Sequence, residues 1–291
     1  MSVLMHDAAN MLGPEARAAY DRGDLADLAF ADDTLLMGVS CPHISEYLAA
    51  VEISGKRFGM ELHHDKFQLL QVNADGLVHL PSGIAVSASA NMGYLGTTLA
   101  EDGRIRSELG RRIGIARADF DTLSRVWSHS ALGRKRKLSI YQALVESKLL
   151  YGLATVCMNV AELRRLNGFQ NKCLRKILGI APSFISRVSN KTVVQHASCK
   201  TASAQLLGMQ LRLLQKVVMA EPEHPLRLSC LVGDTLQPLA SFYIRRVGRP
   251  RKEWLSTVLP HGLQIAGGSN STMRHLMQDE NVWKQLVKNY I

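Results

Sequence analysis

Apolar and polar residues are spaced in two different ways along the chain. In the first hundred residues the apolar runs are short and turn-forming residues separate them, a pattern typical of strands and short helices. Around residues 28–36, apolar residues stand on both sides of a polar pair, which predicts two short buried strands that turn back on each other. We expect a helix before this hairpin, another over residues 44–58, then a turn and a strand, and a second hairpin over residues 84–99.

From residue 102 onward the spacing is that of amphipathic helices. Apolar residues recur every three or four positions between Ile105 and Trp127, so one face of a long helix is apolar. The same spacing predicts helices over residues 134–152 and 161–178, and a further helix over 191–219. The three helices between 104 and 178 are basic on their polar faces; the first carries Arg104, Arg106, Arg111, Arg112 and Arg117.

These patterns together predict the α+β fold class and three regions. Residues 1–100 form a layer of hairpins and helix, residues 101–180 form an all-α region, and residues 181–291 form a more weakly defined helical region. In the last region we expect a basic linker around residue 250, a Gly-rich joint at 267–271, and a short final helix.

The composition of the chain indicates which class of partner it binds and which cellular compartment it occupies. The chain has 291 residues, 46% of them hydrophobic, and a formal net charge of +10, which favours an acidic partner such as a nucleic acid. Ribosomal and membrane-surface proteins share such a charge. The five widely spaced cysteines indicate neither a disulfide framework nor a zinc signature. With no signal-type or membrane-spanning run, we expect a soluble protein of the nucleus or cytoplasm, without a membrane partner.

Asp32 and Asp33 are the strongest chemical signal in the sequence. They are adjacent carboxylates at the point where the first apolar run must turn. Two ionised neighbours repel, and holding both charged is favourable mainly when divalent cations lie between them and a phosphate. This is the arrangement of two-metal phosphoryl transfer. The alternative is a polar hairpin turn, for which Asp is a common residue.

The segment Phe30-Ala31-Asp32-Asp33 resembles the aromatic-x-Asp-Asp box of reverse transcriptases, and the non-LTR, LINE-type retrotransposon branch is the most similar. Further segments follow in that family's order. They are Gly59 to Leu62 with Lys66, the hairpin segment Met92 to Leu99, the helical segments ending at Leu149-Leu150-Tyr151-Gly152, and Val247-Gly248-Arg249-Pro250-Arg251-Lys252-Glu253-Trp254.

This resemblance implies a function and a set of partners. It implies an RNA-directed DNA polymerase that uses an RNA template, a DNA primer and two Mg²⁺ ions, with Asp32 and Asp33 as metal ligands. Lys66 corresponds to a lysine near the incoming triphosphate, and Tyr94, Leu95 and Gly96 to a hairpin that grips the primer. Residues 1–100 would be part of the palm and residues 101–180 the helical thumb.

Two basic segments are candidate nucleic-acid contacts. Arg134, Lys135, Arg136 and Lys137 stand at a predicted helix N-terminus, where four cations oppose the helix dipole. That cost is offset if a phosphate backbone passes the helix, although a nuclear-localisation or simply solvated cluster has the same composition. The second segment contains Arg249 and Arg251. It approaches the Gly-Arg-Pro core of AT-hooks, and we prefer an exposed basic linker.

The family's third metal-binding aspartate and its nucleotide-pocket segment have no counterpart among the 29 residues before Phe30. We therefore expect an N-terminally truncated polymerase that is inactive by itself, or a non-catalytic relic that binds nucleic acid. A third interpretation is an unrelated helical interaction protein. It requires that Asp32 and Asp33 do not lie at a hairpin tip beside Tyr94, Leu95 and Gly96.

Overall fold

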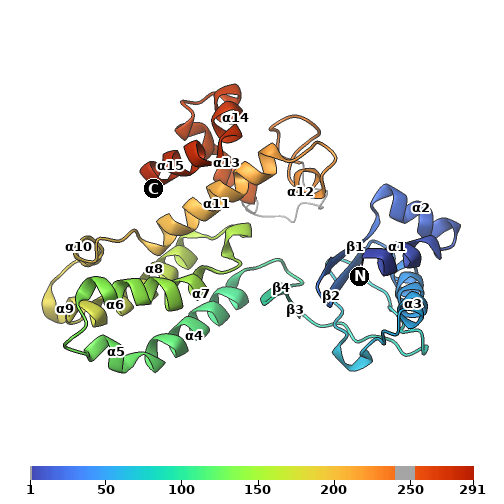
Figure 1. Cartoon of the computed structure of the whole chain (residues 1–291), viewed down its shortest axis with the longest axis horizontal. Helices are drawn as coiled ribbons and strands as arrows, with labels where there is room; N and C mark the ends of the chain where they lie inside the picture. The colour runs from blue at the N-terminus through green and yellow to red at the C-terminus, as the bar shows by residue number, and fades with distance from the viewer. Residues whose placement is uncertain (1, 240–252) are drawn as a thin grey trace. The chain divides into compact units, whose positions relative to one another are not determined.

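A computed structural model describes residues 2–239 and 253–291 (Figure 1). The fold is α+β and mostly helical, with two small antiparallel sheets, as the sequence predicts. The chain divides into two compact units, Met1–Glu108 and Leu109–Ile291. Residues 181–291 belong to the same compact unit as the helices that precede them.

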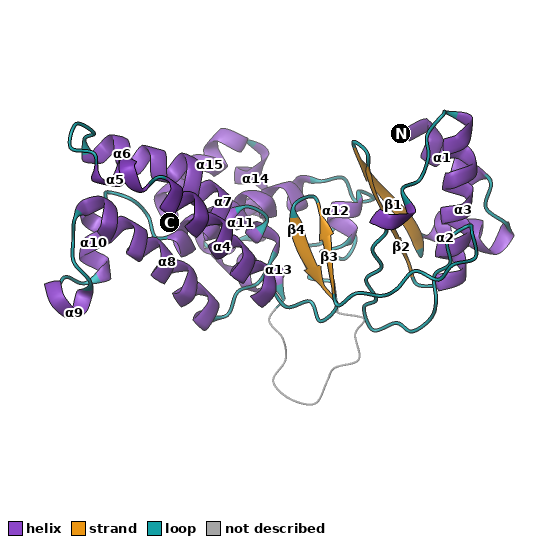
Figure 2. Ribbon diagram, turned by 90° about the horizontal axis from the view of Figure 1, so that it is seen from below, coloured by secondary structure: helices purple, strands orange, loops and turns teal. Residues whose placement is uncertain are grey.

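The first unit contains short helices and two hairpins, drawn in Figure 2 as purple coils and orange arrows. Its elements are α1 (Ser2–Asn10), α2 (Pro14–Arg22), β1 (Leu25–Phe30), β2 (Asp33–Gly38), α3 (Cys41–Arg57), η1 (His64–Lys66), β3 (Asn91–Tyr94) and β4 (Thr97–Ala100).

The core of the first unit lies between α1, α2, α3 and the start of β1. Leu4, Ala8 and Tyr47 are buried there, and the Ser54 hydroxyl ties α3 to α1 by donating to the Leu4 carbonyl oxygen at 3.0 Å. Only the beginning of β1 joins this core, because Leu25 is buried while the strand becomes exposed toward its end.

The second unit is entirely helical apart from loops and an isolated bridge in its described part. Its elements are α4 (Arg106–Thr122), which begins in the first unit, α5 (Ser124–Ser128), α6 (Arg134–Tyr141), the π-helical turn η2 (Gln142–Glu146), α7 (Ser147–Leu150), η3 (Leu153–Thr155), α8 (Val160–Leu178), α9 (Ser183–Ser186), α10 (Asn190–His196), α11 (Ala202–Met219), α12 (Pro225–Leu228), α13 (Trp254–Ile265), α14 (Asn270–Gln278) and α15 (Glu280–Tyr290).

Two aromatic contacts anchor the second unit. The Trp127 indole stacks on Phe120 with ring centroids 4.9 Å apart and donates to the Phe120 carbonyl oxygen at 2.7 Å. Near the C-terminus, the buried Trp283 indole donates to the Leu211 carbonyl oxygen at 3.0 Å, which fixes α15 against α11. Most of the apolar stripe predicted between Ile105 and Trp127 is buried, while Ile105 and Leu123 are half-buried. The single long helix predicted there is two helices, because α4 ends at Thr122 and Trp127 lies on α5.

Several predicted elements need correction. The strands around 28–36 are not buried: Leu28 is 47% and Phe30 66% exposed, because the described residues place no further strand beside this two-stranded ribbon. The second hairpin occupies 91–100 rather than 84–99. The helix predicted over 191–219 is two helices, separated at 197–201, where Thr201 caps α11.

Candidate functional site

Asp32 and Asp33 lie at the tip of the β1–β2 hairpin. Phe30 pairs with Asp33, so Ala31 and Asp32 form a two-residue turn. Ala31 has a φ of +55°, a conformation in which glycine is strongly preferred. Both carboxylates are exposed. The backbone of the Asp-Asp turn is therefore strained, and its acidic side chains are accessible to a ligand.

A second strained turn joins β3 to β4. Tyr94 pairs with Thr97, which leaves Leu95 and Gly96 as the two turn residues. Both have positive φ, +45° at Leu95 and +70° at Gly96. This is the pattern of a type I′ turn, in which Asn-Gly is the favoured pair. Gly96 meets that requirement, whereas Leu95 adopts the conformation at a cost.

The two hairpins contact each other within the first unit. The Tyr94 hydroxyl donates to the carbonyl oxygen of Leu28 on β1 at 3.3 Å. The interpretation as an unrelated protein required that Asp32 and Asp33 not lie at a hairpin tip beside the Tyr94-Leu95-Gly96 turn. In the structure Asp32 and Asp33 lie at a hairpin tip, and the Tyr94 hydroxyl contacts the same hairpin at Leu28, four residues before Asp32.

Lys66 belongs to a segment that is bonded to the second hairpin. It ends the short helix η1 and is exposed. Two residues later, the Gln68 side-chain oxygen accepts from the backbone nitrogen of Gly93 at 2.9 Å. Gln68 thus ties the segment that contains Lys66 to the β3–β4 hairpin.

Asp32 and Asp33 are the metal ligands that the resemblance implies. Within the described residues, no group of three or more His, Cys, Asp or Glu side chains could hold a metal ion. Asp27, on β1, has another role: its Oδ1 accepts from the Tyr20 and Tyr47 hydroxyls at 3.1 and 2.7 Å. Burial raises the pKa of Tyr47, and its bond to Asp27 raises it further. Asp27 therefore fastens β1 to α2 and α3.

The basic run at the start of α6 divides into two roles. Arg134, Lys135 and Arg136 are exposed, as nucleic-acid contacts must be. Lys137 is buried, and its ammonium donates to the Trp127 carbonyl oxygen at 2.7 Å. The prediction that Lys137 contacts nucleic acid is corrected accordingly, because its charge holds α6 against the end of α5.

Three more predicted surface cations need comment, Arg112, Arg249 and Arg251. Arg112 is 5% exposed, with its guanidinium over the Tyr151 ring at 4.6 Å from the centroid, so it belongs to the packing of α4 rather than to its basic face. Arg249 and Arg251 lie outside the residues that the structure describes.

A buried carboxyl group in the second unit was missed by sequence reasoning. Glu146 lies at the end of the π-helical turn and accepts from the Gln170 side chain at 2.9 Å. Burial raises its pKa, against the opposing effect of hydrogen bonds from Gln205 and Gln170. Burial also raises the pKa of the nearby Cys199 thiol, to about 11. The available signal was an acidic residue within the apolar spacing of residues 141–150.

Comparison of the chain with protein-family models, with curated proteins and with solved structures finds no match. No helix among the described residues is both long and apolar enough to cross a bilayer. The function is therefore inferred from the residues and the geometry of this chain itself.

Proposed function

We propose that this chain binds a DNA primer on an RNA template as the palm and thumb part of a LINE-type reverse transcriptase. The observation that carries the proposal is the contact between two strained hairpins, one with Asp32 and Asp33 at its tip and the other formed around Leu95 and Gly96. The order of sequence motifs and the net charge of +10 support it independently.

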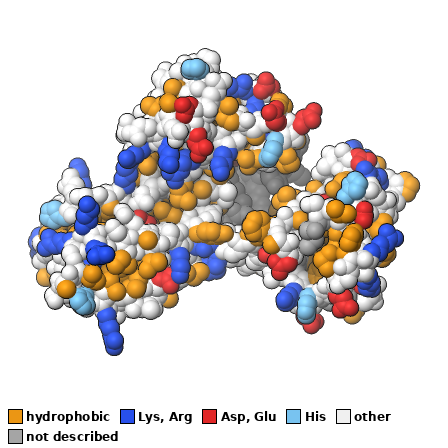
Figure 3. Space-filling view, viewed as in Figure 1, with side chains coloured by type: hydrophobic (Ala, Val, Ile, Leu, Met, Phe, Trp, Pro, Cys, Tyr) orange, Lys and Arg blue, Asp and Glu red, His pale blue; other side chains and the backbone are white. Residues whose placement is uncertain are grey.

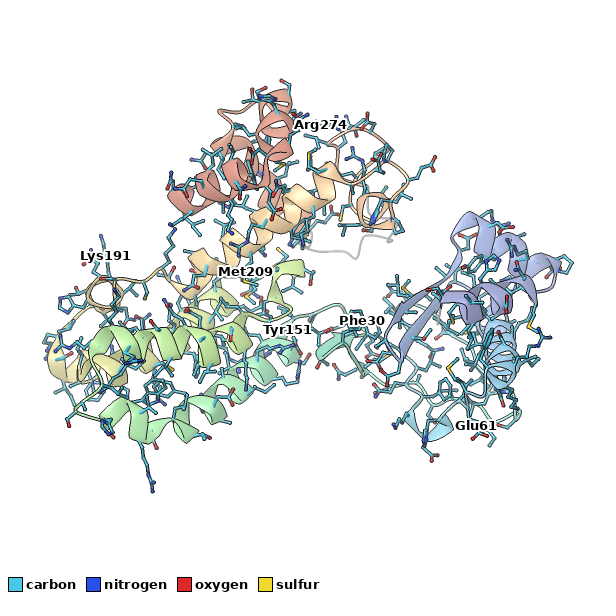
Figure 4. The ribbon with its side chains drawn as sticks, viewed as in Figure 1. Phe30, Glu61, Tyr151, Lys191, Met209 and Arg274 are labelled. Atoms are coloured by element: carbon cyan, nitrogen blue, oxygen red, sulfur yellow. The ribbon has the colours of Figure 1, made fainter. Side chains whose placement is uncertain are left out.

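In this proposal the first unit positions the primer end. Tyr94, Leu95 and Gly96 contact the primer strand, and their turn is held to β1 by the Tyr94 hydroxyl. The exposed Phe30, labelled in Figure 4, lies at the end of β1 next to the carboxylates and offers an apolar surface to a sugar or base. Lys66 supplies a point charge for a triphosphate.

The second unit binds the phosphate backbone without reading sequence. Arg134, Lys135 and Arg136 are exposed at the N-terminus of α6, where no side chain caps the helix. Cations at this end oppose the helix dipole, and a phosphate beside them relieves that cost. Contacts of this kind fix the orientation of a duplex and are insensitive to its sequence.

The isolated chain is proposed to bind without polymerising. Mg²⁺ would assist a primer hydroxyl and a leaving pyrophosphate, but Asp32 and Asp33 supply only part of the ligands that such a site needs. A polymerase also needs groups that place template and nucleotide, and without that placement the rate falls by many orders of magnitude. The non-catalytic relic is the second candidate function, and the incomplete carboxylate set favours it for this chain alone.

The test is primer extension and primer–template binding measured on the same samples. An RNA template, a DNA primer, Mg²⁺ and all four dNTPs are used with the unaltered chain, with Asp32→Ala/Asp33→Ala, and with the control Asp75→Ala/Glu101→Ala, which removes two exposed carboxylates of the same unit outside the two turns. Binding without extension is the expected result.

Two other results are informative. Extension that is lost in Asp32→Ala/Asp33→Ala and kept in the control would show that a complete site is assembled, for example by association of two chains. Absence of both binding and extension would contradict the proposal.

A further inference from the structure

The net positive charge of the chain comes from one stretch. Residues 163–220 contain ten Lys and Arg and no Asp or Glu, whereas the rest of the chain has 25 of each kind. The stretch covers most of α8, then α9, α10 and α11. Figure 3 shows Lys and Arg side chains in blue over the α9 and α10 region, and Lys191 on α10 is labelled in Figure 4. A basic stretch of this length without acidic residues favours a polyanionic ligand.

Two large apolar side chains point into solvent in the middle of this stretch. Phe184 is 74% exposed and its neighbour Ile185 is 64% exposed, both on the single-turn helix α9. Hydrating two such side chains is unfavourable, and burying either one against a ligand is favourable. Adjacent exposed apolar residues are a typical feature of a binding surface.

The turn that presents Phe184 is fixed by a buried arginine. The Arg175 guanidinium donates to the carbonyl oxygens of Ala181 and Val188 at 2.9 and 2.7 Å and to the Asn190 side-chain oxygen at 3.0 Å. Arg187, directly after α9, has a φ of +58°. Arg175 therefore shapes the loop on both sides of α9, and the exposure of Phe184 is a preorganised feature rather than an effect of a loose loop.

An open pocket lies beside this turn. Its volume is about 500 Å³, and Gly168, Lys172 and Lys176 of α8 line it together with Pro182 and Ser183. Lys172 and Lys176 are exposed, and like charges four residues apart on a helix repel. None of the lining residues is acidic. The pocket is thus lined by two exposed cations and by Ser183, the residue before Phe184, while the Lys176 ammonium also lies over the Phe120 ring at 5.6 Å from its centroid.

We propose that this pocket and α9 together bind a single-stranded segment of nucleic acid, with its phosphates at Lys172 and Lys176 and a base stacked on Phe184. The inference rests on the proposed nucleic-acid-binding function and assigns it a second site. Cations beside an exposed aromatic ring are the combination that single-strand binding proteins use, because every unstacked base offers a π-face. In a duplex those faces are already stacked on each other.

The experiment measures binding of a short oligo(dT) over a range of salt concentrations. Phe184→Ala removes the stacking surface, Lys172→Gln/Lys176→Gln removes the charges, and Phe58→Ala, which truncates a 49% exposed ring in the first unit, is the matched control. We expect Phe184→Ala to weaken binding about tenfold with an unchanged salt slope, because stacking is not screened by salt. Lys172→Gln/Lys176→Gln lowers the salt slope, which is the slope of the logarithm of the binding constant against the logarithm of the salt concentration, by about 1.4. Phe58→Ala binds oligo(dT) with the same affinity and salt slope as the unaltered chain.

A tryptophan in place of Phe184 gives a second measurement of binding. In Phe184→Trp, a stacked base quenches the indole fluorescence at the same oligo(dT) concentrations that saturate binding. Circular dichroism of each variant confirms that the helices remain formed.

The contrary outcomes separate this inference from the proposed function. Oligo(dT) binding that is equal in Phe184→Ala and the control overturns the single-strand site, while retained primer–template binding leaves the proposed function standing. Failure to bind either form of nucleic acid overturns both. Binding to anionic lipid vesicles that depends on Phe184, with oligo(dT) binding unaffected, assigns the surface to a membrane and overturns the inference.

Discussion

The hydroxyl of Tyr94 and the carbonyl oxygen of Leu28 are 3.3 Å apart, although 66 residues separate them in the sequence. This bond joins β3 to β1 and holds the Leu95-Gly96 turn against the strand that leads to Asp32 and Asp33. A contact of this range depends on the fold of the whole first unit. It gives the proposed primer site a fixed geometry, which the first prediction tests.

Removal of this hydroxyl should loosen the two hairpins. Tyr94→Phe keeps the ring and deletes the bond, so we expect a loss of roughly 0.5–1.5 kcal/mol in the free energy of unfolding and weaker primer–template binding. Urea unfolding and fluorescence anisotropy measure the two effects. Tyr141→Phe is the matched control, because the buried Tyr141 hydroxyl has no hydrogen-bond partner among the described residues. Equal binding by both variants would contradict a role for the bond.

Replacing the strained Leu95 should raise the stability of the chain and weaken its binding to primer–template. Asn tolerates positive φ better than Leu and is the favoured first residue of a type I′ turn, so Leu95→Asn should raise the free energy of unfolding by about 1 kcal/mol. If Leu95 contacts the primer, the same variant binds primer–template more weakly. Gly96→Ala is expected to lower stability by a similar amount. A Leu95→Asn variant that is more stable and binds as tightly as the original would remove Leu95 from the proposed site.

Stability of the second unit should depend on pH through Glu146. Burial raises its pKa in the folded state above the unfolded value, so folding favours the protonated carboxyl. The contribution of this group is therefore most favourable below about pH 4.3, the unfolded pKa, and is lost as the pH rises through the folded pKa. Glu146→Gln should flatten this dependence and be more stable than the original chain at pH 7.

The measurement for Glu146 is the urea midpoint between pH 4 and pH 8. Glu162→Gln is the control, since Glu162 belongs to the exposed capping box of α8, where glutamine also satisfies the box. A pH profile that Glu146→Gln leaves unchanged would show that the buried carboxyl does not titrate differently on folding.

Substitution of Lys137 should lower stability, whereas substitution of Lys135 should weaken nucleic-acid binding. Lys137→Ala removes a buried ammonium that donates to the Trp127 carbonyl oxygen and should cost about 1–3 kcal/mol of stability, with little effect on the salt dependence of duplex binding. Lys135→Ala, at an exposed position two residues earlier, should leave stability unchanged and reduce the salt slope by about 0.9. The reverse pattern would return Lys137 to the nucleic-acid surface.

The local spacing of apolar and polar residues was sufficient to predict part of this structure. The spacing of apolar residues predicted α3, α4 and α8, because each buries one stripe against the core. The turn at Asp32 was also predicted, since a polar pair between two apolar runs has few other solutions. The strained φ values of Ala31 and Leu95 could not be read from spacing, because neither residue type favours them.

Burial depends on neighbours that the spacing of residues within one helix does not reveal, so the sequence predicted burial poorly. Lys137 and Arg112 have the spacing of surface cations, but each is buried against a segment that arrives from elsewhere: the end of α5 in one case and Tyr151 in the other. In the β1–β2 ribbon the opposite error occurs: apolar residues that were predicted to be buried are exposed, because an apolar run does not reveal whether another layer covers it.

Cross-linking of the primer terminus tests the central claim most directly. A DNA primer with a photoreactive 3′-terminal base is annealed to an RNA template, bound to the chain and irradiated, and the linked peptides are identified by mass spectrometry. We predict attachment within residues 28–36 and 92–97, the two hairpins joined by Tyr94 and Leu28, and loss of that attachment when unlabelled primer–template is added in excess. Attachment confined to the second unit, or spread evenly over the chain, would contradict the claim that these hairpins form a primer site.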